Sequence, residues 1–306
     1  MDENILVTRG LTKEYGKFTA VNSANLSIKK GQIYGLIGRN GAGKTTILRM
    51  VAGQSIPTSG EIELFSETNN LDKVRTRIGS MVEEPSFFPY MTARQNLEYY
   101  RLQRGIPGES NYVDDILKEV GLKDVGKKKF KSFSLGMKQR LGLGLALMSS
   151  PDFLILDEPV NGLDPMGIVE IRNLLLKLNS ERNMTIIISS HILSELSNLA
   201  TNYGFIDNGI ILEELSSEEL HEKCKACIEI KVDNPSKVTA LLEKELKCNE
   251  YEVLPSNIIH IYSYIEDPSI ISDLVVKNGV KLMYMEIKGQ SLEDYFISIV
   301  GGNKNA

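Results

Sequence analysis

Residues 38–46 (GRNGAGKTT) have the composition and spacing that phosphate chemistry requires. Gly38, Gly43, Lys44 and Thr45 match the pattern G-x-x-x-x-G-K-[ST]. Glycines allow successive backbone N–H groups to turn toward a phosphate at a helix N-terminus. The lysine ammonium can bridge the β- and γ-phosphates, and the threonine hydroxyl can ligate Mg²⁺. The stretch therefore predicts a nucleotide site that uses Mg²⁺.

Three further polar side chains follow apolar runs. Asp157 and Glu158 come after FLIL, and His191 ends the segment MTIIISSH. A parallel strand buried on both faces needs continuous apolar residues, and its C-terminal end lies at the ligand crevice of the sheet. Adjacent side chains on an extended segment point apart, so Asp157 can face Mg²⁺ while Glu158 faces an attacking water. An acidic surface pair and a purely structural histidine are the alternatives.

The elements around these residues have the order of a P-loop α/β fold. An apolar run at 33–37 predicts a buried strand before the loop, and 46–52 suits one face of a helix. Further strands are predicted within the segments listed here: 5–11, 26–28, 59–67, 77–89, 151–160 and 184–191. Residues 92–147 have helical patterns, and 167–179 read as an amphipathic crossover helix. We expect a doubly wound sheet with a helical subdomain at about 90–150.

Composition bounds the class of protein. The chain has 306 residues, 42% of them hydrophobic and 25% charged, which is ordinary for a globular protein of about two domains. Its net charge of -5 argues against a general nucleic-acid binder. No apolar run approaches the roughly 18 residues that span a bilayer, and the N-terminus is acidic and polar, unlike a signal peptide. We expect a cytoplasmic chain.

Three cysteines are too few for a disulfide framework. Cys224 and Cys227 form a CxxC, with His221 and Cys248 nearby, which could serve zinc or redox chemistry. Because no second CxxC or histidine pair completes a ligand set, spare buried thiols are the favoured interpretation.

Six motifs in order produce a family resemblance. Tyr15, residues 38–46, SFSLGMKQR (132–140), FLILDEP, NGLD (161–164) and His191 together resemble the ATP-binding subunit of an ABC transporter over about residues 4–215. This resemblance implies that Tyr15 stacks on adenine, that Asp157 belongs to the metal site with Thr45, that Glu158 is the catalytic base and that His191 is a switch histidine. It further implies that nucleotide contacts come from Gly38, Asn40, Gly41, Gly43, Lys44, Thr45 and Thr46.

The resemblance also implies an assembly. Ser134 and Gly136 fall on the signature motif, which in the family binds the γ-phosphate of ATP held by the opposite subunit. Asp164 falls on the loop that crosses the dimer interface. With one P-loop and one signature in the chain, complete sites require an ATP-dependent homodimer.

Two departures from the common family pattern point to a subgroup. Leu135 replaces the first glycine of the signature, and Glu83 replaces the usual glutamine of the Q-loop. An ionised Glu accepts hydrogen bonds but donates none, so Glu83 can serve Mg²⁺ or orient water, but it cannot donate to a phosphate. Both features are similar to the ATPases of bacitracin-type and lantibiotic self-protection exporters. A tolerated substitution is the alternative for Glu83.

The loop that begins at Glu83 carries aromatic residues. We expect Phe87, Phe88 and Tyr90 to be exposed before the helical subdomain, where they would contact a permease. The alternative is that they are ordinary core residues.

The tail, 218–306, differs from the first 217 residues. Its segments predict the order β-α-β-β-α-β-α, which matches a ferredoxin-like α+β sandwich. This fold hosts many functions and names none, so regulation and simple structural support stay open.

The function that these features favour is ATP hydrolysis powering a separate integral-membrane permease, with the chain peripheral at the inner face of the membrane. Export of a peptide antibiotic or lantibiotic follows from the subgroup likeness, and another exported substrate is the alternative. A non-transport ABC ATPase of the DNA-repair or translation type lacks support, because the chain has one cassette and an acidic balance, so no nucleic-acid partner is expected. The signature and NGLD segments disfavour a different P-loop enzyme such as a small-molecule kinase.

Overall fold

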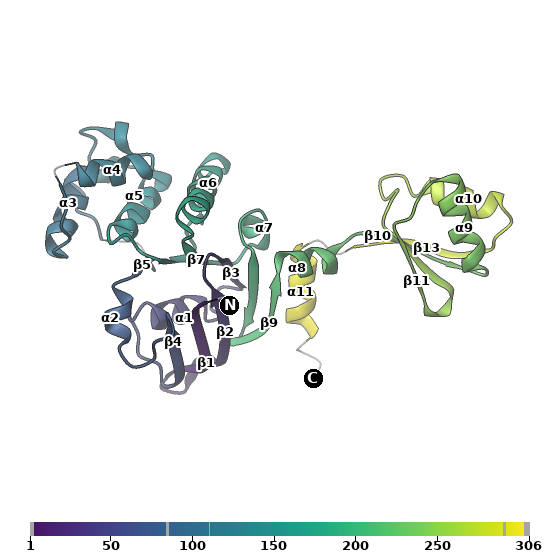
Figure 1. Ribbon diagram of the computed structural model, residues 1–306, viewed down its shortest axis with the longest axis horizontal. Coiled ribbons are helices and arrows are strands. Elements are labelled where there is room, and N and C mark those ends of the chain that lie inside the picture. Colours follow the sequence, from purple (N-terminus) through teal and green to yellow (C-terminus); the bar gives the residue numbers. More distant parts are fainter. Residues whose placement is uncertain (1–2, 84–85, 110, 290–291, 303–306) are drawn as a thin grey trace. The chain divides into compact units, whose positions relative to one another are not determined.

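The computed structural model describes residues 3–83, 86–109, 111–289 and 292–302 (Figure 1). The chain divides into two compact units, Met1–Ser217 and Glu218–Ala306. No helix in these described ranges is long and apolar enough to cross a membrane.

The first unit is built on a six-stranded sheet that carries the P-loop. Its strand order is β5-β6-β7-β3-β8-β9, parallel from β5 to β8, with β9 antiparallel at one edge. The central strands are buried along almost their whole length, as the continuous apolar runs predict. The strands are β3 (Ile33–Gly38), β5 (Ile78–Met81), β6 (Phe153–Asp157), β7 (Thr185–Ser190), β8 (Asn202–Asp207) and β9 (Ile210–Ser216).

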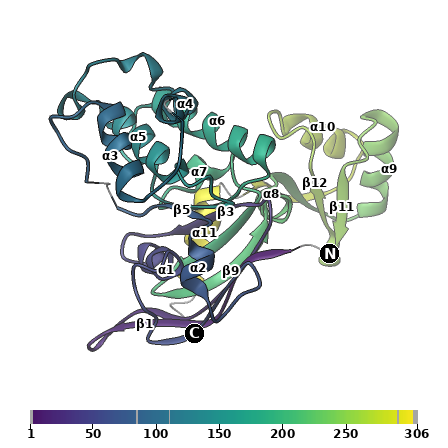
Figure 2. The same ribbon diagram turned by 60° about the vertical axis from the view of Figure 1, so that its left-hand side comes forward.

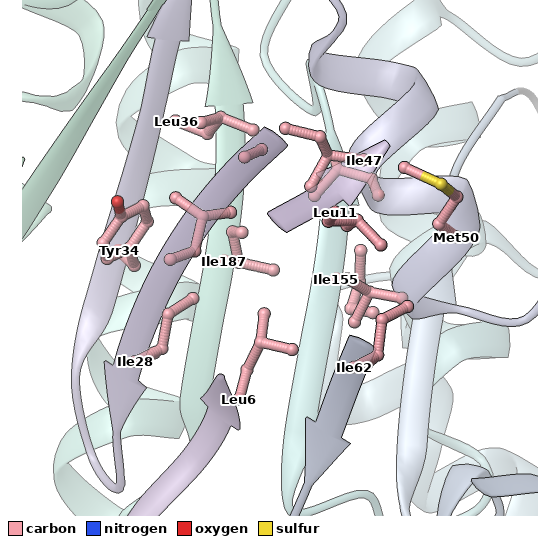
Figure 3. Close-up of a cluster of buried hydrophobic side chains, with 14 of the residues drawn as sticks. Leu6, Leu11, Ile28, Tyr34, Leu36, Ile47, Met50, Ile62, Ile155 and Ile187 are labelled. Atoms are coloured by element: carbon pink, nitrogen blue, oxygen red, sulfur yellow. The ribbon is translucent and has the colours of Figure 1, made fainter. Parts of the chain in front are cut away.

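A smaller antiparallel sheet completes the core of this unit. It has the order β2-β1-β4, from β1 (Asn4–Tyr15), β2 (Phe18–Lys29) and β4 (Ser59–Leu64). β1 and β2 are longer than the strands predicted at 5–11 and 26–28. Apolar side chains from both sheets and from helix α1 (Lys44–Val51) form one buried cluster (Figure 3). Because β3 and α1 both contribute to this cluster, it fixes the two ends of the P-loop that joins them.

Helices α3, α5 and α6 start at side chains that cap them. Thr92 and Gln95 form a capping box at α3, Ser134 caps α5, and Asp164 caps α6, which has Pro165 in its first turn. Helices α3, α4 and α5 pack against one another and lie together in Figure 2. The segments are α2 (Leu71–Arg75), α3 (Ala93–Gln103), α4 (Tyr112–Glu119), the 3₁₀ turns Lys123–Val125 and Phe130–Ser132, α5 (Leu135–Leu147), α6 (Pro165–Arg182) and α7 (Leu193–Leu196).

The second unit contains a four-stranded antiparallel sheet with the order β11-β12-β10-β13. Helices alternate with these strands in the predicted β-α-β-β-α-β-α order, and the strand order is that of a ferredoxin-like sandwich. Helix α8 precedes the first strand and has no counterpart in the prediction. The elements are α8 (Ser217–Cys224), β10 (Cys227–Val232), α9 (Pro235–Glu245), β11 (Tyr251–Leu254), the 3₁₀ turn Pro255–Asn257, β12 (Ile258–Ile261), α10 (Ser269–Lys277), β13 (Leu282–Lys288) and α11 (Leu292–Gly302).

The three cysteines are free thiols in this unit. Cys227 and Cys248 are buried and Cys224 is half-buried. Within the described residues, no group of three or more His, Cys, Asp or Glu side chains is placed to hold a metal ion. Burial raises the pKa of the Cys224 and Cys227 thiols, with further contributions from nearby carboxylates, so neither position favours a reactive thiolate.

Candidate active site

The P-loop links the end of β3 to the start of α1. Gly43 is the residue before the helix and has φ of 107°, a conformation that L side chains rarely adopt. A Cβ there would lie 2.6 Å from the Ala20 carbonyl oxygen, so the loop tolerates only glycine at this position. Because no side chain caps α1, the N–H groups of its first turn are available to an anion.

Lys44 is held at the base of this loop. Its ammonium donates to the carbonyl oxygens of Gly38 (2.7 Å) and Arg39 (3.2 Å). It also lies 3.3 Å from a carboxylate oxygen of Glu158. The Lys44 side chain is 4% exposed, so these partners balance a buried positive charge. Protein groups therefore fix the ammonium at the base of the loop.

Asp157 connects the P-loop to two neighbouring strands. One carboxylate oxygen accepts from the Thr45 hydroxyl (2.7 Å), and the other accepts from the Ser189 hydroxyl (2.6 Å). Ser189 Oγ in turn accepts from the backbone N–H of Glu158 (2.9 Å). Hydroxyl and carboxylate oxygens are the ligands that Mg²⁺ prefers, so the adjacent Thr45 and Asp157 fit a Mg²⁺ site.

Glu158 is placed at the end of β6 with φ of 46°, in the left-handed region. Its carboxylate faces His191, whose Nδ1 lies 3.0 Å from Oε2, and the same oxygen accepts from the Asn161 amide at 3.1 Å. The two carboxylates contact different partners: Asp157 bonds Thr45 and Ser189, whereas Glu158 bonds Asn161 and lies beside Lys44 and His191. The predicted acid and histidine are therefore in contact.

A cavity of about 270 Å³ lies over the P-loop. It brings together Tyr15, at the end of β1, with the loop and Glu158. Phe18, at the start of β2, was missed by sequence reasoning, although an aromatic three residues after Tyr15 was a signal. The cavity is lined by Tyr15, Phe18, Ala20, Asn40, Gly41, Ala42, Gly43, Lys44, Thr45, Thr46 and Glu158.

Ser134, Gly136 and Asp164 line a different cavity of about 310 Å³. Within one chain, none of these three residues lines the cavity over the P-loop. The hydroxyl of Ser134 accepts from the N–H of Met137 (3.3 Å), and the carboxylate of Asp164 accepts from the N–H of Gly167 (3.2 Å), so both side chains also cap helices.

Leu135, the departure in the signature, packs toward the neighbouring loop of residues 161–164. A Cβ at Gly162, which has φ of 73°, would lie 3.2 Å from Leu135 Cδ2. The larger residue at position 135 is thus accommodated by a glycine in the facing loop.

Glu83 is placed after β5, with φ of 70°. Its carboxylate forms an ion pair with Arg49 of α1, and the side chain is 65% exposed. No described contact joins it to Thr45 or Asp157. Arg49 was missed by sequence reasoning, which assigned it no role. Glu84 and Pro85 of the predicted permease-contact loop lie outside the described residues.

The prediction for the aromatic residues was wrong in one position. Phe87 is buried, with its ring against Tyr100 and Phe130. Phe88 and Tyr90 are exposed, as predicted. The backbone N–H of Phe88 donates to the buried Asn96 side chain, and the Asn96 amide donates to the carbonyl oxygen of Phe88. Because these bonds fix the loop against α3, Phe87 faces inward.

Comparison with known proteins identifies the family of this site. A family model described as ABC transporter matches residues 21–161. The chain is 44% identical to the bacitracin transport ATP-binding protein BcrA of Bacillus licheniformis, over 97% of this chain and 98% of that protein. The chain belongs to the ABC transporter ATP-binding proteins. It is an ATPase that couples the hydrolysis of ATP to transport, as the motifs predict.

A second relative and a solved structure match the nucleotide-binding part of this ABC ATPase. The lantibiotic transport ATP-binding protein SrtF of Streptococcus pyogenes is 46% identical over 71% of this chain and 95% of that protein. Among solved structures, the dimeric post-hydrolysis state of the cassette MJ0796 bound to ADP and phosphate is 25% identical, with a TM-score of 0.63 over 69% of this chain and 98% of that chain. These matches confirm the predicted fold of the nucleotide-binding unit.

Proposed function

We propose that this ABC ATPase powers the export of a peptide antibiotic through a separate integral-membrane permease, as a homodimer at the inner face of the membrane. The observation that carries the cargo class is the 44% identity to a bacitracin transport ATP-binding protein, which extends over 97% of this chain. That likeness includes the second unit, which lies outside the match to the general family model. The likeness to a lantibiotic transport protein supports the same class.

The residues of the cavity over the P-loop divide the work of ATP hydrolysis in this proposal. Tyr15 and Phe18 provide aromatic faces for the base, and the N–H groups of residues 40–46 bind the phosphates. Lys44 exchanges its contact with Glu158 for the β- and γ-phosphates. Glu158 then accepts a proton from the attacking water, and His191 orients its carboxylate through the 3.0 Å contact.

Thr45 and Asp157 would hold Mg²⁺, which supplies positive charge against the phosphate oxygens. The 2.7 Å hydrogen bond between these side chains supports that assignment, because it brings two oxygen donors together. Glu83 would join this shell or orient water only after its ion pair with Arg49 opens.

Two copies of the chain complete each site in this proposal. Because Ser134, Gly136 and Asp164 line a cavity separate from that of Lys44, one chain alone does not bring the signature to its own P-loop. The dimeric structure of the related cassette MJ0796 supports assembly as a dimer.

Resistance measurements test the cargo. In a host that carries the permease, we expect removal of this chain to increase sensitivity to a bacitracin-type or lantibiotic peptide. The wild-type chain should restore resistance, while Glu158→Gln should not. If deletion changes sensitivity to none of these peptides but removes export of an unrelated compound, the peptide cargo is wrong and the ATPase assignment stands.

Subunit mixing tests the dimer. Lys44→Ala and Ser134→Arg are each expected to inactivate the homodimer, because both composite sites carry a lesion. In the mixed dimer, one site carries both lesions and the other carries neither, so activity should return to about half. Mixed dimers that form and hydrolyse no ATP would contradict the composite site.

A further inference from the structure

Ser189 is buried at the C-terminal end of β7, two residues before His191. It is 0% exposed, and the strand places it beside Asp157 in the register between β6 and β7. An apolar side chain is the usual occupant of such a position, because the strand is buried on both faces. A hydroxyl there has to be hydrogen-bonded, and its partners reveal its role.

Both partners of this hydroxyl belong to the hydrolytic pair. Ser189 Oγ donates to Asp157 Oδ1 at 2.6 Å and accepts from the backbone N–H of Glu158 at 2.9 Å. The second oxygen of Asp157 accepts from Thr45 at 2.7 Å. One hydroxyl therefore connects the carboxylate of Asp157 to the backbone of the residue that follows it.

The bond to Glu158 matters because that residue has φ of 46°, which a non-glycine residue rarely adopts. Such a backbone costs about 1–3 kcal/mol and persists only where its surroundings hold it. The N–H of Glu158 is the group that Ser189 holds. Loss of this bond frees the peptide to rotate, and rotation carries the carboxylate away from His191.

From these contacts we infer that Ser189 is a positioning residue for ATP hydrolysis. Its hydroxyl sets the direction of the Asp157 carboxylate toward Thr45 and locks the backbone that aims Glu158 at the cavity. The inference rests on the proposed roles of Glu158 and Asp157. Groups that hold a ligand or base in place affect activity nearly as strongly as the ligands themselves, by about 10–100-fold when removed.

The test compares Ser189→Ala with a matched variant of the same strand. Thr185, at the other end of β7, is also 0% exposed, and its hydroxyl accepts from the N–H of Gly31 at 2.9 Å. Thr185→Val removes that hydroxyl without changing the shape of the side chain. Thr185→Val loses one hydrogen bond away from the site, whereas Ser189→Ala loses two, both at the hydrolytic pair.

We expect Ser189→Ala to lower the kcat for ATP hydrolysis by about 10–100-fold, while the KM for ATP changes by less than about 3-fold. Binding of a fluorescent ATP analogue should be retained, and the Mg²⁺ concentration needed for that binding should rise. Thr185→Val should keep the wild-type kcat. Ser189→Thr, which keeps the hydroxyl, should recover most of the lost rate if its thermal unfolding remains cooperative.

The outcomes separate the inference from the function on which it rests. A kcat for Ser189→Ala within about 2-fold of wild type overturns the positioning role when Glu158→Gln is inactive. Equal losses in Ser189→Ala and Thr185→Val assign the effect to general stability and overturn it as well. If Glu158→Gln hydrolyses ATP normally, the proposed role of Glu158 fails instead.

Discussion

Glu158 in the first unit and Glu229 in the second are each held by a lysine and a histidine. Glu158 lies 3.3 Å from Lys44 and 3.0 Å from His191. Glu229 lies 2.7 Å from Lys288 and 2.6 Å from His260, and it also accepts from Tyr284. The partners are of the same chemical types.

The two carboxylates differ in where the strand places them. Glu158 follows the C-terminal end of β6 and lines the cavity over the P-loop. Glu229 lies in the middle of β10, beneath Tyr284, Lys288 and His260. Only 4% of the residue is exposed. Similar partners therefore make a candidate site at Glu158, where the strand end leaves the carboxylate lining a cavity, and a covered structural cluster at Glu229.

The largest expected difference between them is in activity. Glu158→Gln keeps the shape of the side chain and loses the base, so ATPase should fall by about 10²–10⁴-fold. Nucleotide binding should persist, because Lys44 is then released from its carboxylate partner. ATP turnover and binding of a labelled nucleotide measure the two effects. Glu229→Gln should hydrolyse ATP at the wild-type rate, and an equal loss in both variants would remove the distinction.

The reverse difference is expected in stability. Glu229→Gln replaces a charge-assisted acceptor that is almost fully covered, which should destabilise the second unit by about 1–3 kcal/mol. Faster hydrogen exchange of the β10 and β12 amides in the full-length chain would report it. Glu252→Gln is the control, because this exposed carboxylate on β11 bonds only the Tyr262 hydroxyl among the described contacts, at 3.2 Å. Equal exchange in both variants would contradict a stabilising role for Glu229.

Acid should reduce that stability difference. The ammonium of Lys288, with the hydroxyl of Tyr284 and the imidazole of His260, lowers the pKa of Glu229 from 4.5 to about 2. A depressed carboxyl pKa stabilises the folded state above the ordinary value, and this contribution is lost as the pH falls toward the depressed value. The ratio of the amide exchange rate of Glu229→Gln to that of wild type, measured at the same pH, should therefore fall from pH 6 to pH 3. A ratio of exchange rates that stays constant over this range would assign the destabilisation to packing.

The sequence allowed the nucleotide site to be predicted because its chemistry depends on local spacing. Gly43, Lys44 and Thr45 are adjacent, and Asp157 and Glu158 follow one buried strand, so their placement at one edge of the sheet follows from the strand pattern. The predicted order of the second unit held for the same reason, since its periodic segments are separated by clear turns.

Contacts between side chains distant in sequence could not be predicted in this way. Ser189 read as one more residue of a buried strand, yet it bonds Asp157 across the sheet. Phe87 was predicted to be exposed because it lies in the loop that begins at Glu83, whereas the Asn96 side chain holds this loop against α3. The pairing of Glu83 with Arg49 likewise requires knowledge of where the segment after β5 lies relative to α1. Each of these contacts joins residues that are distant in the sequence, and neither composition nor hydrophobic periodicity specifies such contacts.

The smallest expected effect belongs to Glu83, which resembles Glu158 in lying after a sheet strand but is 65% exposed. An exposed ion pair contributes about 0–1 kcal/mol, so breaking the contact with Arg49 alone should change ATPase by no more than about 5-fold. Glu83→Gln keeps an oxygen acceptor at the same reach and should retain most of the hydrolysis. Glu83→Ala removes the acceptor and should lose more.

Coupling to transport should respond more than hydrolysis, because the loop after Glu83 leads to the exposed Phe88 and Tyr90. Resistance of cells carrying Glu83→Ala should therefore fall by a larger factor than the ATPase rate of the purified variant. Arg49→Gln is the matched control: it removes the ion pair and keeps the carboxylate. If Arg49→Gln reproduces both losses, Glu83 acts through the pair, whereas an effect confined to Glu83→Ala assigns the role to the carboxylate itself. Wild-type hydrolysis and resistance in all three variants would show that this acid has no special part in the cycle.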